Sequence, residues 1–324
     1  MAEDEIWVDP DMRQAMARSA EIAREYGLAA DRSTLTPEQA RERMELDRRW
    51  WNQERPEMAR IVDTTVAGPQ RDIPVRLLYP REGENLPVIV YLHGGGWVVG
   101  SLETHARSMH LLALASGCVV AAVDYALAPE TKFPGAIEET VAVIDFVAAS
   151  GADWSLDPSR IALGGDSAGA NLAVGAELAL RSRGVSPVKA LGLVYGVFGD
   201  DFETPSYRTF GGGAWGLTTA DMKAYFAHYL GTEADRDDPR AVPMKADVSG
   251  FPPCFLHAAG VDVLRDDSRL FYEKLRGAGV PVEHTEHAGI IHGSMGQTRM
   301  VAKARDLISC LGRQLAGALG GEER

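Results

Sequence analysis

The chain has 324 residues, of which 45% are hydrophobic and 24% are charged, and its formal net charge is −13. This composition is that of an ordinary globular protein, and no segment reaches the roughly 18 uninterrupted apolar residues that a membrane span requires. The acidic balance argues against nucleic acids and anionic membranes as partners, because the summed field of the protein would repel a phosphate backbone.

The segment 1–60 differs in composition from the rest, since it is rich in Arg, Glu, Ala and Met and contains no β-like run. Its first nine positions hold four acidic residues and no signal-like basic or apolar region, so we expect a cytoplasmic protein. A helix is predicted after Thr36, because Pro37 suits the first helical position and Gln39 completes a capping box. Its apolar residues recur at helical spacing, namely Ala40, Met44 and Trp51. This stripe predicts helices that cover another part of the protein.

Short apolar runs alternate with helical stretches from about residue 61 onward. The predicted strands lie at residues 75–79, 87–92, 118–123, 160–163, 188–195, 254–257 and 280–283. This alternation predicts an α/β fold with a mainly parallel sheet covered on both faces, and such sheets place their chemistry at the carboxyl ends of the strands.

The interval 199–250 breaks this rhythm, because it has no strong strand and contains a predicted helix at 219–230. An insertion of this length between two strands indicates a lid. We therefore expect N-terminal cap helices over residues 1–55 and a catalytic domain over 56–324, with a cap insertion at about 200–245.

A serine lies within the stretch Gly165-Asp166-Ser167-Ala168-Gly169, between a predicted strand and a predicted helix. The pattern G-x-S-x-G in this context is typical of a nucleophile elbow, a strained turn that exposes the serine hydroxyl above the sheet. Glycines are needed two positions before and after the serine because the strand and helix backbones come too close for side chains. The alternative is a glycine-rich entry into a helix without a catalytic role.

Three consecutive glycines follow the predicted strand at 87–92, in the sequence HGGGW at residues 93–97. Their backbone N–H groups have no side-chain cover and can point at a developing oxyanion. Taken alone the stretch could be a flexible turn. Together with an elbow it predicts an acyl-transfer site, in which such a loop supplies an oxyanion donor.

The general base and its orienting acid should follow the serine in the chain, in the order Ser, Asp/Glu, His. Asp262 and His292 each follow a predicted strand and could form a triad with Ser167. His284 lies at the edge of the last predicted strand, and His287 remains a competitor for the role of base. Two other carboxylates are given structural roles: Asp266 as a cap for a helix at 268–276, and Asp166 as a neighbour of the serine.

Four aromatic residues are candidates for the substrate pocket. Trp97 and Tyr195 follow strand ends and either line the pocket or pack under the cap. Phe210 and Trp215 flank a glycine run that formally matches G-x-G-x-x-G but follows no convincing strand, so nucleotide binding is not expected. These two residues either shape a substrate channel or belong to an exposed loop.

Metal and cofactor sites are not expected from the sequence. The three cysteines, Cys118, Cys254 and Cys310, are widely spaced in apolar surroundings and form no CxxC pair. This spacing favours reduced, buried thiols over disulfides or metal ligands.

The motifs, taken in order, resemble the hormone-sensitive-lipase family of α/β-hydrolases, also called bacterial family IV esterases, in its GDSAG branch. The resemblance covers about residues 60–310 and rests on HGGGW at 93–97, DYALAPE at 124–130, GDSAG at 165–169, DPR at 238–240, GFPP at 250–253 and GVDVLRD at 260–266. The chain departs from the family pattern at three positions, Ala126, Val263 and Ser294, where Arg, Pro and Phe are usual. The last of these alters the wall beside His292.

The resemblance implies an α/β-hydrolase fold with a triad of Ser167, Asp262 and His292, and it favours His292 over His287. It also implies oxyanion donors from the backbone N–H groups of Gly95, Gly96 and Ala168. A cap built from the N-terminal helices and the middle insertion is expected by the same similarity. A homodimer through the last strand and the final helix is expected as well.

These features predict a serine carboxylesterase that hydrolyses short-chain acyl or small aromatic esters through an acyl-enzyme, without a cofactor. The same triad could serve an amidase, a lactonase or a carbamate hydrolase. A non-catalytic small-molecule receptor on the same fold is a further alternative. The presence of Ser167, Asp262 and His292 together argues against a receptor.

Overall fold

A central sheet organises the computed structural model, which describes residues 6–28, 35–184 and 186–320. Its eight strands follow the order β1-β2-β4-β3-β5-β6-β7-β8. The strands are β1 (Arg60–Ala67), β2 (Asp72–Tyr79), β3 (Leu86–Leu92), β4 (Val119–Val123), β5 (Leu156–Asp166), β6 (Val188–Val194), β7 (Cys254–Val261) and β8 (Val282–Ile291). All neighbouring strands from β4 to β8 pair in parallel, whereas β2 runs antiparallel to both β1 and β4. The predicted α/β class is therefore confirmed.

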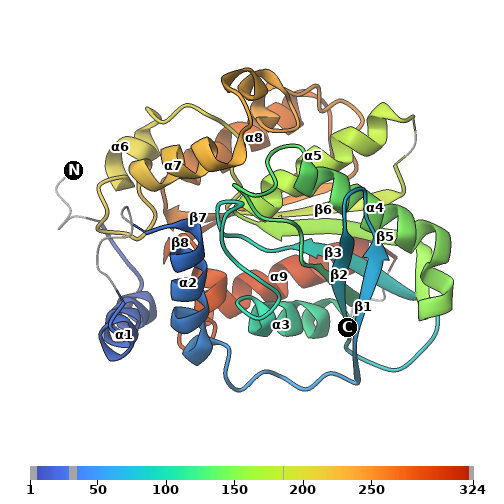
Figure 1. Cartoon of the computed structure of the whole chain (residues 1–324), viewed down its shortest axis with the longest axis horizontal. Helices are drawn as coiled ribbons and strands as arrows, with labels where there is room; N and C mark the ends of the chain where they lie inside the picture. Colours follow the sequence, from blue (N-terminus) through green and yellow to red (C-terminus); the bar gives the residue numbers. More distant parts are fainter. Residues whose placement is uncertain (1–5, 29–34, 185, 321–324) are drawn as a thin grey trace.

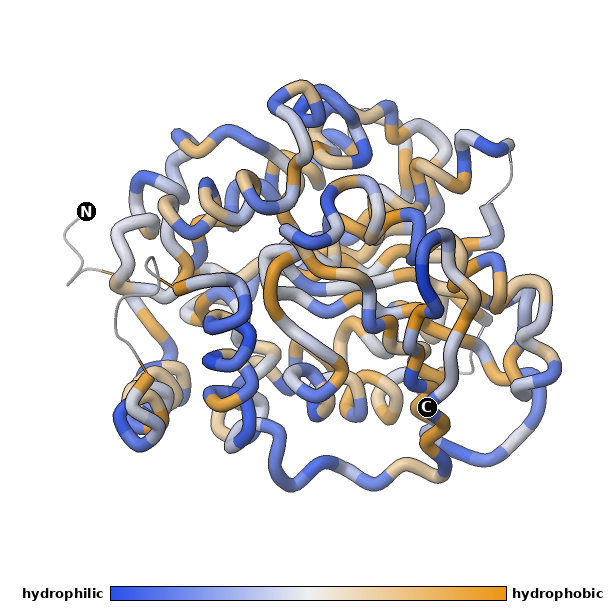
Figure 2. The backbone as a smooth tube through the Cα atoms, in the orientation of Figure 1, coloured by the Kyte–Doolittle hydropathy of each residue, from blue (hydrophilic) through white to orange (hydrophobic). Residues whose placement is uncertain are grey.

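Helices cover both faces of the sheet (Figure 1). On one face α3 (Ala106–Ser116) packs against α9 (Ala302–Ala318), and on the other α4 (Gly135–Ser150) packs against α5 (Ala168–Ser182). A further helix, α8 (Arg265–Gly277), packs on β7 and β8. Every residue of β3 and β4 is buried, as expected for parallel strands covered on two sides. Figure 2 shows the resulting apolar colouring through the middle of the sheet.

The N-terminal part forms two helices, α1 (Pro10–Glu25) and α2 (Pro37–Trp51), side by side at one end of the molecule (Figure 1). The predicted capping box is present, with Thr36 Oγ1 accepting from Gln39 N at 3.3 Å and Gln39 Oε1 accepting from Thr36 N at 3.0 Å. The apolar stripe of α2 has a partner, because Ala40 and Met44 pack against the buried cluster Val98, Val99 and Ala128. Residues 1–5 and 29–34 of the expected cap segment lie outside the described residues.

The interval between β6 and β7 contains no strand, as predicted. It contains the helices α6 (Pro205–Phe210) and α7 (Thr219–Tyr229) and the short 3-10 helices η3 (Glu233–Asp237) and η4 (Pro243–Lys245). Two further 3-10 helices lie elsewhere in the chain, η2 (Gly151–Trp154) and η5 (Ser294–Gln297). Two carboxylates at the start of α8 hold this segment by its backbone. Asp267 Oδ2 accepts from Phe198 N at 3.0 Å and from Gly199 N at 2.9 Å, and Asp266 Oδ2 accepts from Ser206 N at 2.8 Å.

Three local predictions were wrong. β1 was not predicted, because it is a polar edge strand with only one buried residue. β8 spans Val282–Ile291, whereas the prediction was 280–283. The prediction ended too early because the strand contains polar residues, His284 and Glu286 among them, which interrupt the apolar pattern. Asp266 lies in the first turn of α8, whose N-cap is Leu264, and therefore does not cap that helix.

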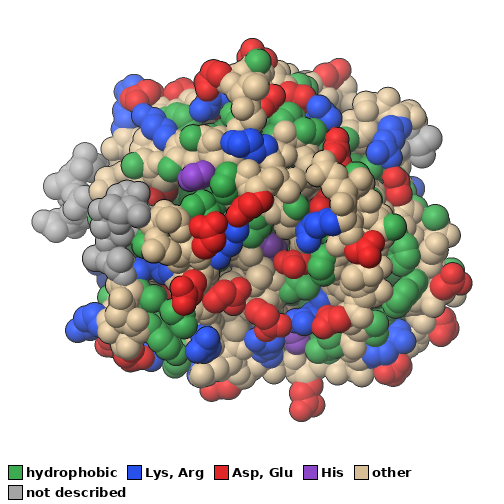
Figure 3. All heavy atoms as spheres, viewed as in Figure 1, with side chains coloured by type: hydrophobic (Ala, Val, Ile, Leu, Met, Phe, Trp, Pro, Cys, Tyr) green, Lys and Arg blue, Asp and Glu red, His purple; other side chains and the backbone are tan. Residues whose placement is uncertain are grey.

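Exposed charges are distributed over the surface, and acidic side chains alternate with basic ones on the face drawn in Figure 3. No helix within the described ranges combines the length and apolar character needed to cross a membrane. The three cysteines are free; Cys118 and Cys254 are buried as expected, whereas Cys310 is only half-buried.

A pair of histidines links β7 and β8 away from the serine. His257 Nδ1 lies 2.9 Å from His287 Nε2, and His257 Nε2 lies 2.8 Å from Gln314 Oε1. Burial lowers the pKa of both histidines below the usual value of 6.5, so the folded protein holds them neutral. The unfolded chain binds protons below that value, which means that stability is lost as the pH falls.

We expect the free energy of unfolding to decrease between about pH 7 and about pH 5, with a contribution of about 1 to 2 kcal/mol from His257. His257→Gln should reduce this pH dependence, whereas His228→Gln, on α7, should leave it unchanged. Urea unfolding at both pH values measures the difference. Identical slopes in His257→Gln and the parent protein would contradict the assignment.

Candidate active site

The turn between β5 and α5 carries Ser167 in a strained conformation with φ 55° and ψ −119°. A Cβ on Gly165 would lie 2.5 Å from the carbonyl oxygen of Leu92, and a Cβ on Gly169 only 2.0 Å from that same oxygen. Only glycine fits at these two positions because β5 and α5 meet the end of β3 so closely. The turn therefore has the geometry of a nucleophile elbow, with the serine at the carboxyl end of the sheet.

Ser167, His292 and Asp262 form a continuous chain of hydrogen bonds. His292 Nε2 lies 2.9 Å from Ser167 Oγ, and His292 Nδ1 lies 2.8 Å from Asp262 Oδ2. The other carboxylate oxygen of Asp262 accepts from Leu264 N at 3.0 Å, which fixes the orientation of the acid. Ser167 is 6% exposed and Asp262 is 2% exposed, so bulk water reaches this series of hydrogen bonds only near the imidazole. This arrangement can remove a proton from the serine and hold it on the histidine.

Adjacent parallel strands bring these residues together. Asp262 directly follows β7 and His292 directly follows β8, so both lie at the same edge of the sheet as Ser167. The competing His287 lies within β8 and bonds to His257 instead. The structure thus places His292, and not His287, beside the serine.

The HGGGW stretch after β3 contains two glycines with positive φ, Gly95 at 129° and Gly96 at 58°. A Cβ on Gly95 would lie 2.0 Å from the carbonyl oxygen of Val99, so this position also requires glycine. Ala168 is the first residue of α5, where N–H groups have no acceptor within the helix. These three residues are the candidate oxyanion donors.

Both parts of the expected cap contact this glycine loop. The ring of Tyr225, on α7, lies over Gly96, where a Cβ would approach its atoms to 2.4 Å. On the other side Arg41, on α2, donates from Nε to Val98 O at 2.8 Å and from Nη2 to Ala128 O at 2.9 Å. The same guanidinium pairs with Glu130 at 2.6 Å. Helices α2 and α7 thus both contact the loop that carries the candidate oxyanion donors.

The four candidate pocket residues have different surroundings. Trp97 is buried and stacks on Tyr229 of α7, with ring centroids 4.3 Å apart, so it packs under that helix. Tyr195 is buried and its ring lies 4.8 Å from that of His292. Phe210 is buried beneath the guanidinium of Arg265. Trp215 is half-buried against the core and directly follows the exposed residues 212–214.

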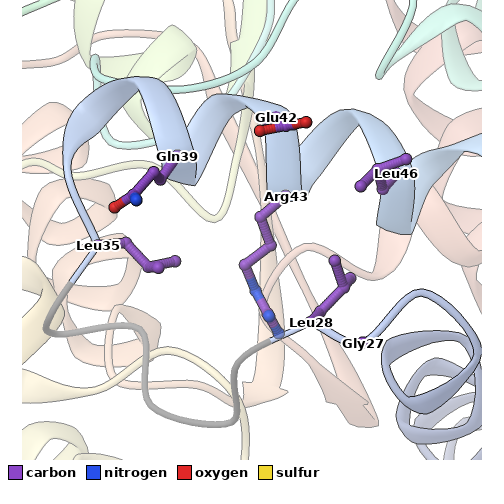
Figure 4. Close-up of a pocket in the computed structure, with 7 residues that line it drawn as sticks. All are labelled: Gly27, Leu28, Leu35, Gln39, Glu42, Arg43 and Leu46. Atoms are coloured by element: carbon purple, nitrogen blue, oxygen red, sulfur yellow. The ribbon is translucent and has the colours of Figure 1, made fainter.

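Two cavities lie on the N-terminal helices, apart from the triad. One of about 140 Å³, shown in Figure 4, is lined by Gly27, Leu28, Leu35, Gln39, Glu42, Arg43 and Leu46. The other, of about 230 Å³, is lined by Glu45, Arg48, Arg49, Asn52, Arg55 and Glu103. Within the described part of the chain, no group of three or more His, Cys, Asp or Glu residues could hold a metal ion.

The chain shows clear likeness to known esterases. A family model described as an alpha/beta hydrolase fold matches residues 89–296. An acetyl esterase of Salmonella schwarzengrund (strain CVM19633) is 38% identical over 266 residues, which cover 81% of each chain. A solved hyperthermophilic esterase from the archaeon Pyrobaculum calidifontis has a TM-score of 0.90 at 33% identity, covering 96% of this chain and 99% of its own. A thermostable carboxylesterase cloned from a metagenomic library has a TM-score of 0.85 at 32% identity, covering 88% and 98%.

The chain therefore belongs to the alpha/beta hydrolase fold family, which confirms the fold expected from its motifs. Within this family it is a carboxylesterase, an enzyme that hydrolyses carboxylic ester bonds. The resemblance to esterases of the hormone-sensitive-lipase family is confirmed at this level. Its assignment to the GDSAG branch stays a prediction.

Several contacts around the site had no sequence signal. Tyr225 lies on a predicted helix, but nothing in the pattern indicates that it meets Gly96. Arg41 is one of many arginines in its segment. Ser294, noted as a departure from the family, is fully buried, and its hydroxyl finds no hydrogen-bond partner in the described structure.

The close approach of Gly169 to β3 yields a stability prediction. Gly169→Ala would drive a Cβ into backbone atoms of Leu92 and His93, so we expect unfolding free energy to fall by about 1–3 kcal/mol. Gly212→Ala is the matched control, because a Cβ there meets nothing within 4 Å, and its effect should stay within about 0.5 kcal/mol. Chemical denaturation measures both. Equal stability of the two variants would show that the elbow tolerates a side chain.

Proposed function

We propose that this carboxylesterase hydrolyses short-chain acyl or small aromatic esters, with Ser167 as nucleophile, His292 as general base and Asp262 as orienting acid. The observation that carries the proposal is the unbroken hydrogen-bonded chain from Asp262 through His292 to Ser167. Each of these three side chains is already within hydrogen-bond distance of the next, so none of them has to move before the reaction.

In the proposed reaction Ser167 Oγ attacks the ester carbonyl while His292 Nε2 takes its proton. The N–H groups of Gly95, Gly96 and Ala168 stabilise the oxyanion of the tetrahedral intermediate. His292 then protonates the leaving alcohol and the acyl-enzyme forms. Water, activated by the same imidazole, releases the acid and restores the serine.

A limit on acyl size follows from the cap, which we propose to consist of residues 1–55 and about 200–245. The ring of Tyr225 lies directly over Gly96, one of the proposed oxyanion donors. An acyl chain bonded to a carbonyl held there would meet that ring after a few carbon atoms. Ser167 is only 6% exposed, and the relative from Salmonella is named an acetyl esterase. Both observations support short acyl groups.

Amides, lactones and carbamates would use the same nucleophile and oxyanion donors, so an amidase, lactonase or carbamate hydrolase is the second candidate. The named relatives are esterases, which favours ester hydrolysis. A homodimer through β8 and α9 stays a prediction. β8 is an edge strand of the sheet, and near its end Gly289 O accepts from Asp9 N at 2.9 Å.

The first test is hydrolysis of p-nitrophenyl acetate and p-nitrophenyl butyrate by the purified protein. Ser167→Ala should abolish turnover, because no other group can form the acyl-enzyme in this scheme. Circular dichroism of the variant checks that the fold is intact. Unchanged activity in a folded Ser167→Ala protein would refute the role of the serine.

The second test is a panel of p-nitrophenyl esters from acetate to dodecanoate. We expect kcat/KM to fall beyond butyrate, and Tyr225→Ala to raise the ratio of octanoate to acetate turnover about tenfold by removing the ring over Gly96. Lys223→Ala, an exposed residue of the same helix, is the control and should leave that ratio unchanged. Equal turnover of long and short esters by the parent protein would contradict an acyl-size limit.

A further inference from the structure

Asp166, the last residue of β5, is buried directly beside the serine, and its side chain is only 5% exposed. Its Oδ1 accepts two hydrogen bonds at 3.0 Å, one from the hydroxyl of Tyr91 and one from the backbone N–H of Gly94. Its Oδ2 lies 3.5 Å from the hydroxyl of Tyr195 and 3.8 Å from His105 Nε2. One carboxylate therefore contacts four separate parts of the fold.

Two of these contacts lead directly to the proposed reacting groups. Gly94 precedes the oxyanion donors Gly95 and Gly96, so the bond to Asp166 fixes the start of that loop. A Cβ on Gly94 would lie 2.5 Å from Asp166 Oδ2, which shows how closely loop and carboxylate approach. Tyr195 places its ring against His292, with centroids 4.8 Å apart. Its positive φ of 34° shows that this position is held by its surroundings.

We propose that Asp166 is a positioning residue of this esterase. Its carboxylate fixes the loop that carries the oxyanion donors, through the bond to Gly94 N. It also orients Tyr195, whose ring lies against His292. In addition to Asp262, it supplies a second negative charge near the imidazolium of His292. The proposal rests on the proposed function, because it assumes that Ser167 and His292 carry the reaction.

Two uncharged donors hold the Asp166 carboxylate, Tyr91 and the N–H of Gly94. Among the described residues, no Lys or Arg forms an ion pair with Asp166. Burial raises the pKa of Asp166, and burial lowers the pKa of His93 and of His105 to about 3, so both histidines are neutral. A buried charge without a counter-ion is costly and is kept only where hydrogen bonds hold it. Here Tyr91 and Gly94 are those donors.

Titratable groups face Asp166 from β3, from the loop after it, from the start of α3, and from the segments that follow β4, β6 and β8. They are Tyr91, His93, His105, Tyr125, Tyr195 and His292. The charges of Asp262 and Arg48 interact with the hydroxyl of Tyr195. Of these groups, His292 is the one whose charge changes in the proposed reaction, when it takes the serine proton.

A negative charge near His292 stabilises the imidazolium that forms when the ring takes the serine proton. Without that charge the imidazolium loses this stabilisation, so we expect the acid limb of the kcat/KM profile to move to lower pH. A residue that only supports the fold would change stability and leave the limb in place.

The experiment compares Asp166→Asn with the parent protein on p-nitrophenyl acetate from about pH 5 to about pH 9. Asparagine keeps the shape and one acceptor oxygen but removes the charge. We expect kcat/KM to fall at least tenfold and the acid limb to move down by about 0.5 to 1 pH unit. Glu139→Gln is the matched control, since Glu139 is a buried carboxylate that also accepts from a backbone N–H, that of Ala126 at 2.7 Å, beside Arg71. Glu139→Gln should lower the stability of the protein without moving the acid limb of the kcat/KM profile.

A second variant, Tyr91→Phe, removes only the buried hydroxyl that bonds to Asp166 and should fold. We expect its kcat to fall several-fold with KM unchanged, because Tyr91 supports the carboxylate and does not reach substrate. An unmoved acid limb in folded Asp166→Asn, or parent-like kcat in Tyr91→Phe, overturns the proposal. If the proposed function itself were wrong, the parent protein would show no serine-dependent turnover, and this outcome differs from both results that overturn the role of Asp166.

Discussion

The site depends on how closely the turn between β5 and α5 approaches the carboxyl end of β3. The carbonyl oxygen of Leu92 occupies the space that a Cβ on Gly165 or Gly169 would need. Ser167, between these two glycines, has a positive φ. The same approach brings Asp166 to the backbone of Gly94. One steric constraint therefore joins the turn that carries Ser167 to the loop that carries the candidate oxyanion donors.

Hydrogen bonds to the backbone attach the N-terminal helix α2 and the insertion between β6 and β7 to the rest of the fold. Arg41 of α2 binds the carbonyl oxygens of Val98 and Ala128, and Asp267 of α8 binds the N–H groups that begin the middle insertion. Both attachments are made to main-chain atoms, which every residue carries, so they depend little on the side chains at those positions.

The sequence predicted well wherever a motif fixes the backbone. The elbow needs glycine at two fixed positions, and buried parallel strands give unbroken apolar runs, so Ser167 and the central strands were identified. Polar edges carry no such signal, which is why β1 was missed and β8 was predicted too short. Trp97 and Tyr195 each had two possible surroundings, because an aromatic residue after a strand is equally compatible with a pocket and with packing under a cap.

The sequence by itself determined the fold class, the elbow and the order of the catalytic candidates, because steric and periodic constraints act on neighbouring residues. The motifs favoured His292 over His287, but only the tertiary structure shows which of the two lies beside Ser167, since that depends on which residue leaves β8 at the level of the serine. Only the tertiary structure brought Tyr225 over Gly96 and placed Asp166 among Tyr91, Gly94 and Tyr195. Those contacts join residues far apart in the chain, and no local pattern encodes them.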